Sequence, residues 1–159
     1  MRHRAGHKRN SARGVVGARP AKRYLTLGAS LGLPALETDA LIRKVQTGLH
    51  YRALETLSSE SGISISEIGA TMQVPERTLA RRRVTGRLSS EESEKLLRFS
   101  HVFEQAVSLF EGDVKAAVAW LKSPKRALSY AAPLAYARTE IGARQVEDLI
   151  GKLEQGVFA

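Results

Sequence analysis

Residues 63–83 read ISISEIGATMQVPERTLARRR, and this stretch decides the fold. Ser64 and Glu67 are spaced as an S-x-x-E capping box, and Ile63 and Ile68 hold the two positions of a hydrophobic staple. This combination is the sharpest helix-start signal in the chain. A short helix is therefore predicted to begin directly after Ser64.

A second short helix follows within the same stretch. The first should run over residues 65–72. Pro75 suits the first turn of the next, which should run to about Arg83 with Gly86 just beyond it. Two short helices joined by a tight turn are typical of a helix-turn-helix. The turn position that usually holds glycine is Gln73, where a left-handed backbone costs some free energy.

Four arginines surround Leu79 on the second helix. With Leu79 as the core anchor, a step of 100° per residue turns Arg77 and Arg81 almost directly away from the core. An apolar back with long donors in front suits a major-groove reading helix, whose N-terminal end also offers N–H groups to a phosphate. The predicted DNA-binding residues are Arg77, Thr78, Arg81, Arg82 and Arg83. The alternative is a solvated basic helix without a ligand.

Helical patterns continue on both sides of this pair. Start signals at Thr38, at Ser89 with Glu92, and at Asp113 are followed by apolar residues at three- and four-residue steps. Further helices are predicted over residues 38–47, 50–59, 89–110 and 143–155. Another should follow the cap at Asp113, carry Trp120 and Leu121 and end before Pro124, and a short segment should run over residues 133–139. The inward side chains should include Leu41, Ile42, Val45, Val146, Leu149, Ile150 and Leu153. No segment alternates with a period of two, so the predicted fold class is all-α.

The composition fits a small folded protein of the reducing cytosol. Of the 159 residues, 43% are apolar and none is cysteine, so disulfides and thiolate chemistry are excluded. No apolar run approaches the roughly 20 residues of a membrane-spanning helix, and no secretion signal is evident. A cytoplasmic location without membrane contact is therefore expected.

The net charge of +9 is concentrated at the start of the chain. Residues 1–23 hold eight of the 25 basic residues and no acidic one, whereas the remainder is nearly neutral. A tail of this composition is predicted to be disordered. It either adds sequence-independent affinity for phosphates or is a solvated leader, an over-extended gene start or an organelle transit peptide.

No catalytic or metal-binding pattern emerges from the titratable residues. His3 and His7 are four residues apart but have no carboxylate near them, and His50 and His101 stand alone. The acidic residues at the start of the 89–110 helix complement the helix dipole and need no active site to explain them. We expect a binding protein that is not an enzyme and has no metal or cofactor.

From about residue 40 to the end, the chain resembles the Xre/MbcA/ParS family of antitoxins and is most similar to its ParS-like members. The motifs that carry the resemblance stand in the right order over some 110 residues. They are Gly48-Leu49, residues 77–82 (RTLARR), residues 86–89 (GRLS) with Glu92, Trp120-Leu121 with Pro124, Ala127-Leu128, Pro133-Leu134, Thr139, Gly142-Ala143, Val146-Glu147 and residues 156–158 (GVF). Where the family often has a glycine pair after Leu128, this chain has residues 129–132 (SYAA).

The resemblance implies an antitoxin with two parts. The helix-turn-helix would bind the promoter of its own operon, and the C-terminal helices would block the active site of a cognate RES-domain toxin, a class that degrades NAD or uses it for ADP-ribosylation. The implied regions are a basic tail over 1–23, a DNA-binding region over 24–88 and a dimerisation and toxin-binding region over 89–159. The implied toxin contacts are Tyr130, Arg138, Arg144, Glu147, Ile150, Leu153, Val157 and Phe158.

The sequence allows alternatives for Phe158 and for the chain as a whole. Phe158 either plugs the toxin's active-site cleft or packs back on the last helix. The chain as a whole could instead be a plain helix-turn-helix repressor whose C-terminal half dimerises or senses a small molecule, or an RNA-associated protein that works through its basic tail. Because helix-turn-helix proteins commonly read two half-sites, a homodimer or a larger toxin–antitoxin assembly is expected.

Overall fold

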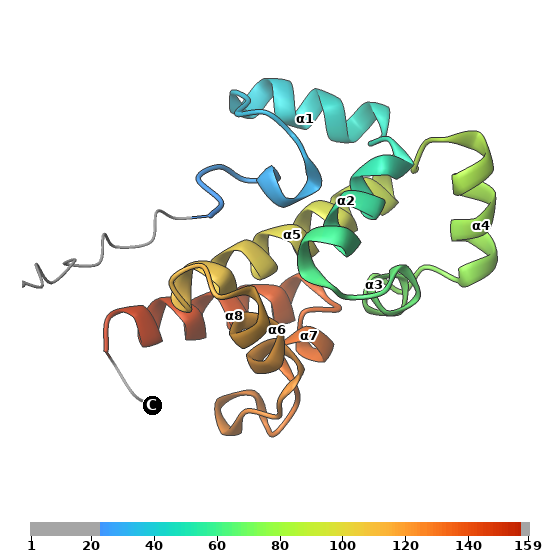
Figure 1. Ribbon diagram of the computed structural model, residues 1–159. Helices are drawn as coiled ribbons and strands as arrows, with labels where there is room; N and C mark the ends of the chain where they lie inside the picture. Colours follow the sequence, from blue (N-terminus) through green and yellow to red (C-terminus); the bar gives the residue numbers. More distant parts are fainter. Residues whose placement is uncertain (1–22, 157–159) are drawn as a thin grey trace, which may run out of the picture.

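The computed structural model describes residues 23–156, and its regular secondary structure is helical (Figure 1). It contains no strand among the described residues, which confirms the predicted all-α class. Most of the predicted basic tail lies outside the described residues, as do Val157 and Phe158. The α-helices are α1 (Thr38–Thr47), α2 (Tyr51–Ser61), α3 (Ile65–Thr71), α4 (Glu76–Thr85), α5 (Ser90–Leu109), α6 (Val114–Lys122), α7 (Pro133–Tyr136) and α8 (Glu140–Glu154), with short 3₁₀ helices η1 (Ala29–Leu31) and η2 (Arg126–Leu128).

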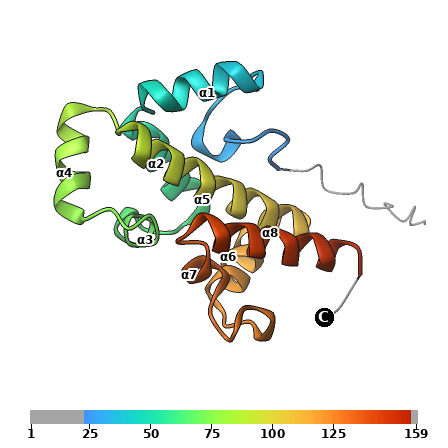
Figure 2. The same ribbon diagram turned by 180° about the vertical axis from the view of Figure 1, so that it is seen from behind.

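Helix α5 forms the centre of the protein. Its start is the predicted capping box: the Ser89 hydroxyl accepts a hydrogen bond from the Glu92 N–H, and the Glu92 carboxylate accepts one from the Ser89 N–H. Helices α6 and α8 pack along α5, and α1, α2 and η1 also contact it. Figures 1 and 2 show α5 running between these two groups of helices. Its apolar side chains, including Leu96, Phe99, Phe103 and Ala106, are buried in the shared core.

Helices α3 and α4 form the predicted helix-turn-helix. Gln73 in the turn has a φ of 56°, so this non-glycine residue adopts the left-handed conformation that the sequence pattern implied. The Val74 N–H donates to the Gly69 carbonyl across 2.9 Å and closes the turn. Gly69 also lets the helices approach closely, because a Cβ there would lie 2.4 Å from Cδ1 of Leu79.

The segment before α1 is fastened to the core by a buried carboxylate. Glu104 on α5 accepts hydrogen bonds from the Ser30 N–H at 2.9 Å, the Ser30 hydroxyl at 2.6 Å and the Gly28 N–H at 3.3 Å. Tyr24 packs on Phe103 with ring centroids 5.6 Å apart. The chain thus enters the fold across α5 before it turns into α1.

The C-terminal helices α6 and α8 cover the other side of α5, and α7 packs against both of them (Figure 2). Asp113 caps α6 by accepting a hydrogen bond from the Ala116 N–H, as its position predicted. Thr139 caps α8 by accepting one from the Gly142 N–H. The last helix therefore starts at Glu140, three residues earlier than expected, because the cap at Thr139 was not anticipated. Gly156 follows α8 with a φ of 72°, as expected for a residue just past a helix end.

Three local predictions were wrong. Thr38 does not cap α1; the cap position is Glu37, and its side chain makes no capping hydrogen bond. Ile42 does not face the core and is 47% exposed, since α1 buries only Val45. The capping box of α3 is half formed, because the Ser64 hydroxyl accepts from the Glu67 N–H but the Glu67 carboxylate reaches Lys122 instead.

Candidate functional site

Helix α4 lies at the edge of the protein (Figure 1) and carries a basic face. Arg77 and Arg81 are exposed and lie four residues apart, while Leu79 is the only buried residue of the helix. Thr78 is half-buried at the side of this face. Ala80 and Val84 lie one turn apart beside these arginines, and Val84 is 88% exposed. The face therefore offers guanidinium donors together with small apolar groups, a set that can contact guanine edges and thymine methyl groups.

Arg82 differs from the other arginines because it is held by a carboxylate. Its Nε donates to the two carboxylate oxygens of Glu92 at 2.9 and 3.1 Å, and its Nη2 donates to one of them at 3.1 Å. Burial alone would raise the pKa of Glu92, but hydrogen bonds from Arg82 and Ser89 hold it below its ordinary value. The hydrogen bonds that Arg82 donates to Glu92 raise the pKa of Arg82 in turn. This guanidinium is thus committed within the protein.

The N-terminal end of α4 is open to a ligand. Pro75 occupies the cap position and provides no side-chain acceptor, so the N–H groups of the first turn have no side-chain cap. The Glu76 carboxylate at the first helical position accepts a hydrogen bond from the Ser66 hydroxyl of α3. This contact ties the start of α4 to α3 and places one negative charge beside the arginine face.

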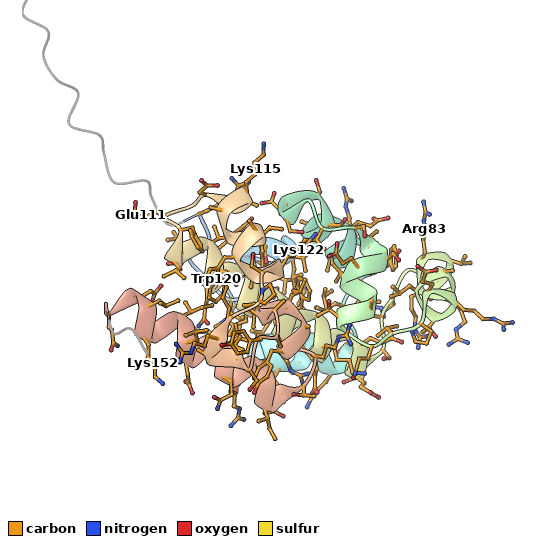
Figure 3. All side chains as sticks on the ribbon, turned by 90° about the horizontal axis from the view of Figure 1, so that it is seen from below. Arg83, Glu111, Lys115, Trp120, Lys122 and Lys152 are labelled. Atoms are coloured by element: carbon orange, nitrogen blue, oxygen red, sulfur yellow. The ribbon has the colours of Figure 1, made fainter. Side chains whose placement is uncertain are left out.

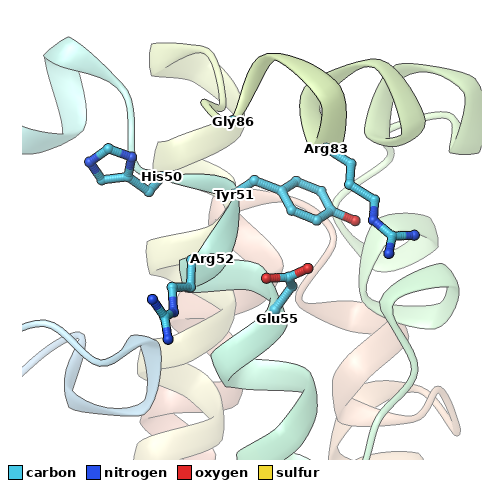
Figure 4. A pocket seen from close by; sticks show the side chains of 6 residues that line it. All are labelled: His50, Tyr51, Arg52, Glu55, Arg83 and Gly86. Atoms are coloured by element: carbon cyan, nitrogen blue, oxygen red, sulfur yellow. The ribbon is translucent and has the colours of Figure 1, made fainter.

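A pocket of about 550 Å³ opens beside the C-terminal end of α4 (Figure 4). His50, Arg52 and Arg83 surround it together with Tyr51 and Glu55. Burial and the Glu55 carboxylate raise the pKa of Tyr51, and the Arg83 charge opposes this shift. Figure 4 shows the Tyr51 hydroxyl directed towards the Arg83 side. The charged lining of this pocket consists of Arg52 and Glu55 from α2 and Arg83 from α4.

The residues predicted to contact a toxin lie on several elements. Tyr130 is 70% exposed in the loop after η2, where Ser129 and Tyr130 both have positive φ angles, of 54° and 65°. Arg138 is exposed between α7 and α8. It lines a pocket of about 390 Å³ that also includes Glu67 and Lys122, which pair across 3.0 Å between α3 and α6. The pocket therefore lies where the helix-turn-helix meets the C-terminal helices.

On α8 the predicted contact residues have different surroundings. Arg144 is exposed and pairs with Glu140 at 2.6 Å, whereas Glu147 is half-buried with one oxygen 3.8 Å from Nε2 of His101. Leu153 is half-buried. Ile150 is 1% exposed and belongs to the core, so a partner cannot reach its side chain in this structure. Figure 3 shows Lys152 of α8 and Arg83 of α4 at opposite ends of the protein.

Sequence reasoning missed the polar residues that join the two halves. Glu92, Glu67, Lys122 and Glu104 make contacts with partners 10 to 76 residues away. Spacing along the chain gives no signal for such pairs. Only the capping positions of Glu67 and Glu92 were visible, because each depends on a serine three residues away.

Two further classes of site are absent from the described part of the chain. Between residues 23 and 156, no group of three His, Asp or Glu side chains is arranged to hold a metal ion. No helix in the same range combines the length and apolar character that crossing a membrane requires.

Two family models match the chain one after the other. The antitoxin Xre-like helix-turn-helix domain covers residues 40–101, and the antitoxin Xre/MbcA/ParS C-terminal toxin-binding domain covers residues 105–156. The chain is 37% identical over 141 residues to Antitoxin Xre of Yersinia enterocolitica, which covers 88% of this chain and 95% of the relative. It is 31% identical over 134 residues to Antitoxin Xre of Photorhabdus laumondii, with 84% and 90% covered. A relative of the same name from Pseudomonas putida is 30% identical over 132 residues. Taken with the fold and the α4 face, these matches show that the chain belongs to the Xre/MbcA/ParS family of antitoxins.

Proposed function

We propose that this protein is the cytoplasmic antitoxin of a toxin–antitoxin pair, which blocks the active site of a RES-domain toxin and represses its own operon. The toxin would be an NAD-consuming or ADP-ribosylating enzyme, and the antitoxin itself would supply no catalysis or cofactor. The observation that carries the proposal is the order of two matched domains on one core, with an exposed arginine face on α4 of the first. A homodimer, alone or within a larger toxin complex, would read two operator half-sites.

The DNA-binding half of the proposal rests on the chemistry of α4. Arg77 and Arg81 are exposed and no salt bridge holds either of them among the described residues, so both guanidinium groups are free to make paired hydrogen bonds to guanine. Thr78 and Arg83 flank them and would contact the phosphate backbone. The uncapped N–H groups at the start of α4 would donate hydrogen bonds to a further phosphate.

The toxin-binding half rests on the C-terminal helices. Tyr130 offers a large exposed aromatic ring, a residue type that often anchors protein interfaces. Arg138, Arg144, Glu147 and Leu153 would add a polar and apolar surround. Val157 and Phe158 lie beyond the described residues and remain predicted contacts. The toxin-binding surface that we propose does not include Ile150, because that side chain is buried.

The first test is the growth of cells that express the neighbouring open reading frame, with and without this protein. Growth arrest that this protein relieves would support the antitoxin function. If the neighbouring product is harmless and operator DNA still binds, the plain repressor alternative holds instead.

The two halves can be separated by point variants. Arg81→Ala should weaken operator binding by about 1–3 kcal/mol, roughly 5- to 150-fold in Kd, because it removes a base contact. It should leave toxin neutralisation intact. The matched control is Arg144→Ala, which removes the same charge from the exposed surface of α8. Equal operator binding by the parent and Arg81→Ala would refute the base contact.

The toxin surface is best tested without removing α8. Truncation after Thr139 would also delete Val146 and Ile150 from the core, and the loss of neutralisation would then report unfolding. Tyr130→Ala and a chain that ends at Gly156 leave the described core intact. Full growth rescue by both variants would show that the toxin binds elsewhere.

A further inference from the structure

Helix α4 has few contacts that set its orientation. Its start follows the turn closed by Val74 and Gly69 and is tied to α3 by the hydrogen bond from the Ser66 hydroxyl to the Glu76 carboxylate. Its end is tied where the Tyr51 N–H donates to the Gly86 carbonyl at 2.9 Å. Between these ends, Leu79 is the only buried side chain of the helix. A single apolar anchor resists withdrawal of the helix but resists rotation about the helix axis only weakly.

The ion pair between Arg82 and Glu92 provides a second anchor. Arg82 follows Leu79 by three residues, so both side chains leave α4 on neighbouring parts of the same side. Three hydrogen bonds of 2.9–3.1 Å join the guanidinium to the carboxylate. Both side chains are well covered, with 25% of Arg82 and 10% of Glu92 exposed.

Glu92 is itself fixed on α5, so it can act as a stationary partner. Its carboxylate accepts the Ser89 N–H at 2.8 Å, and its N–H donates to the Ser89 hydroxyl at 3.1 Å. The oxygen that accepts from Ser89 also accepts from Arg82 Nε. The capping box of α5 therefore fixes the Glu92 carboxylate, which in turn binds Arg82 of α4.

Small rotations of α4 matter for reading DNA. Side chains extend to about 6 Å from a helix axis, so a rotation of about 15° moves their ends by about 1.5 Å. A functional site has to be held within about 0.5 Å of its working geometry. Arg77 and Arg81 project from the face opposite Leu79, and their ends would move by this larger distance.

We propose that Arg82 is a positioning residue of the DNA-reading helix, and that its bidentate pair with Glu92 sets the rotation of α4 about its own axis. The proposal rests on the DNA-binding function proposed above. Arg82 then acts through Arg77 and Arg81 and does not itself contact DNA. The other arginines of α4 would contact DNA directly, whereas Arg82 would orient the helix that carries them.

The decisive variant is Glu92→Gln, for which the two roles of Arg82 predict opposite results. Glutamine keeps the size of the side chain and suits the capping box, but it removes the charge that grips Arg82. If Arg82 positions α4, operator affinity falls by about tenfold. If Arg82 contacts DNA, affinity stays equal or rises, because a guanidinium is released and a negative charge is removed. The matched control is Glu94→Gln, which makes the same charge change on the same helix.

A double-variant cycle gives the second measurement. Arg82→Lys keeps the charge but cannot make the bidentate contact, so it should lose about as much affinity as Glu92→Gln. The double variant should lose no more than either single variant, because both remove the same pair. Additive losses would overturn the positioning role.

Hydrogen exchange without DNA separates this inference from the proposed function. In Glu92→Gln, the amides of α4 should exchange faster, while those of the second half of α5 and of α8 keep the rates of the parent. Unchanged exchange in α4 would overturn the inference even if operator DNA binds. If the parent binds no operator DNA but α4 exchange rises, the DNA-binding function fails and the anchoring of α4 stands.

Discussion

Gly142 and Gly151 on α8 offer a matched pair of substitutions with opposite predicted effects. A Cβ at Gly142 would lie 1.8 Å from the Tyr136 carbonyl oxygen, 2.8 Å from the Tyr136 carbonyl carbon and 3.0 Å from the Thr139 hydroxyl. A Cβ at Gly151 would meet nothing within 4 Å. The first position therefore requires glycine for the close approach of α8 to α7, and the second does not.

The magnitude for Gly142→Ala follows from these contacts. The nearest atom is backbone, so no side-chain rotation can relieve the overlap, and α8 has to move by more than 1 Å relative to Tyr136. Overpacking of this kind costs about 1–3 kcal/mol or more. The Thr139 cap, which bonds to the Gly142 N–H, would be strained as well, at a cost of about 1 kcal/mol. Together they destabilise the fold by about 2–4 kcal/mol, or roughly 6–12 °C in Tm.

Gly151→Ala should stabilise the protein by about 0.5–1 kcal/mol, because alanine loses less conformational freedom than glycine in a helix. Thermal unfolding followed by circular dichroism measures both variants under the same conditions. At temperatures where Gly142→Ala is still folded, it should also neutralise the toxin less well, because α8 is displaced. Operator binding through α4 should persist. A Tm for Gly142→Ala within 2 °C of the parent would refute the assigned contact.

Further predictions concern the turn, the core and pH. Gln73→Gly should stabilise the fold by up to about 1 kcal/mol in urea unfolding, because it removes a non-glycine residue from a left-handed backbone position. The control Gln145→Gly on α8 should destabilise the fold by a similar amount. A loss of stability in Gln73→Gly would contradict the turn geometry. Leu79→Ala should lower the free energy of unfolding by about 2–5 kcal/mol, because Leu79 is buried. A loss below about 0.5 kcal/mol, as is usual for surface substitutions, would argue against this burial. The pKa of Glu92 is lower in the folded protein than its ordinary value of 4.5, so the ion pair with Arg82 stabilises the fold fully above pH 4.5. This stabilisation is lost as the pH falls through the lowered pKa. On acidification below about pH 4.5, the free energy of unfolding should therefore fall more steeply in the parent than in Glu92→Gln. Parallel plots of this free energy against pH would contradict a stabilising ion pair at Glu92.

Local signals in the sequence located most of the fold. The capping pairs at Ser89 and Asp113 and the glycine at 156 act within one helical turn, and the structure has helix ends at each of them. The left-handed turn at Gln73 was visible for the same reason, since its place between two short helices dictates its backbone conformation.

Predictions that depend on which side of a helix meets a neighbour were less reliable. Ile42 has helical spacing with Leu41 and Val45, but α1 is covered on one side only, and Ile42 remains exposed. Ile150 was expected both to face inward and to contact a partner, and only the first fits a side chain that is 1% exposed. Periodicity defines a face and does not say what lies against it.

The candidate site was partly visible for a comparable reason. The exposure of Arg77 and Arg81 followed from their angle to Leu79 on one helix. The capture of Arg82 did not, because Glu92 lies on another helix and ten residues further along the chain. Polar pairs between separate helices depend on how those helices cross, and no short motif records that arrangement.

Helix α5 has a consequence for hybrids between related antitoxins. The two matched family domains meet between residues 101 and 105, in the interior of α5, where no flexible connection separates them. Inserting one residue there would turn everything that follows by about 100° relative to α4. A hybrid that exchanges one half has to preserve the helical register and the core on both sides of the junction. Under the proposed function, a new pairing of operator and toxin would therefore require a splice made within a single helix.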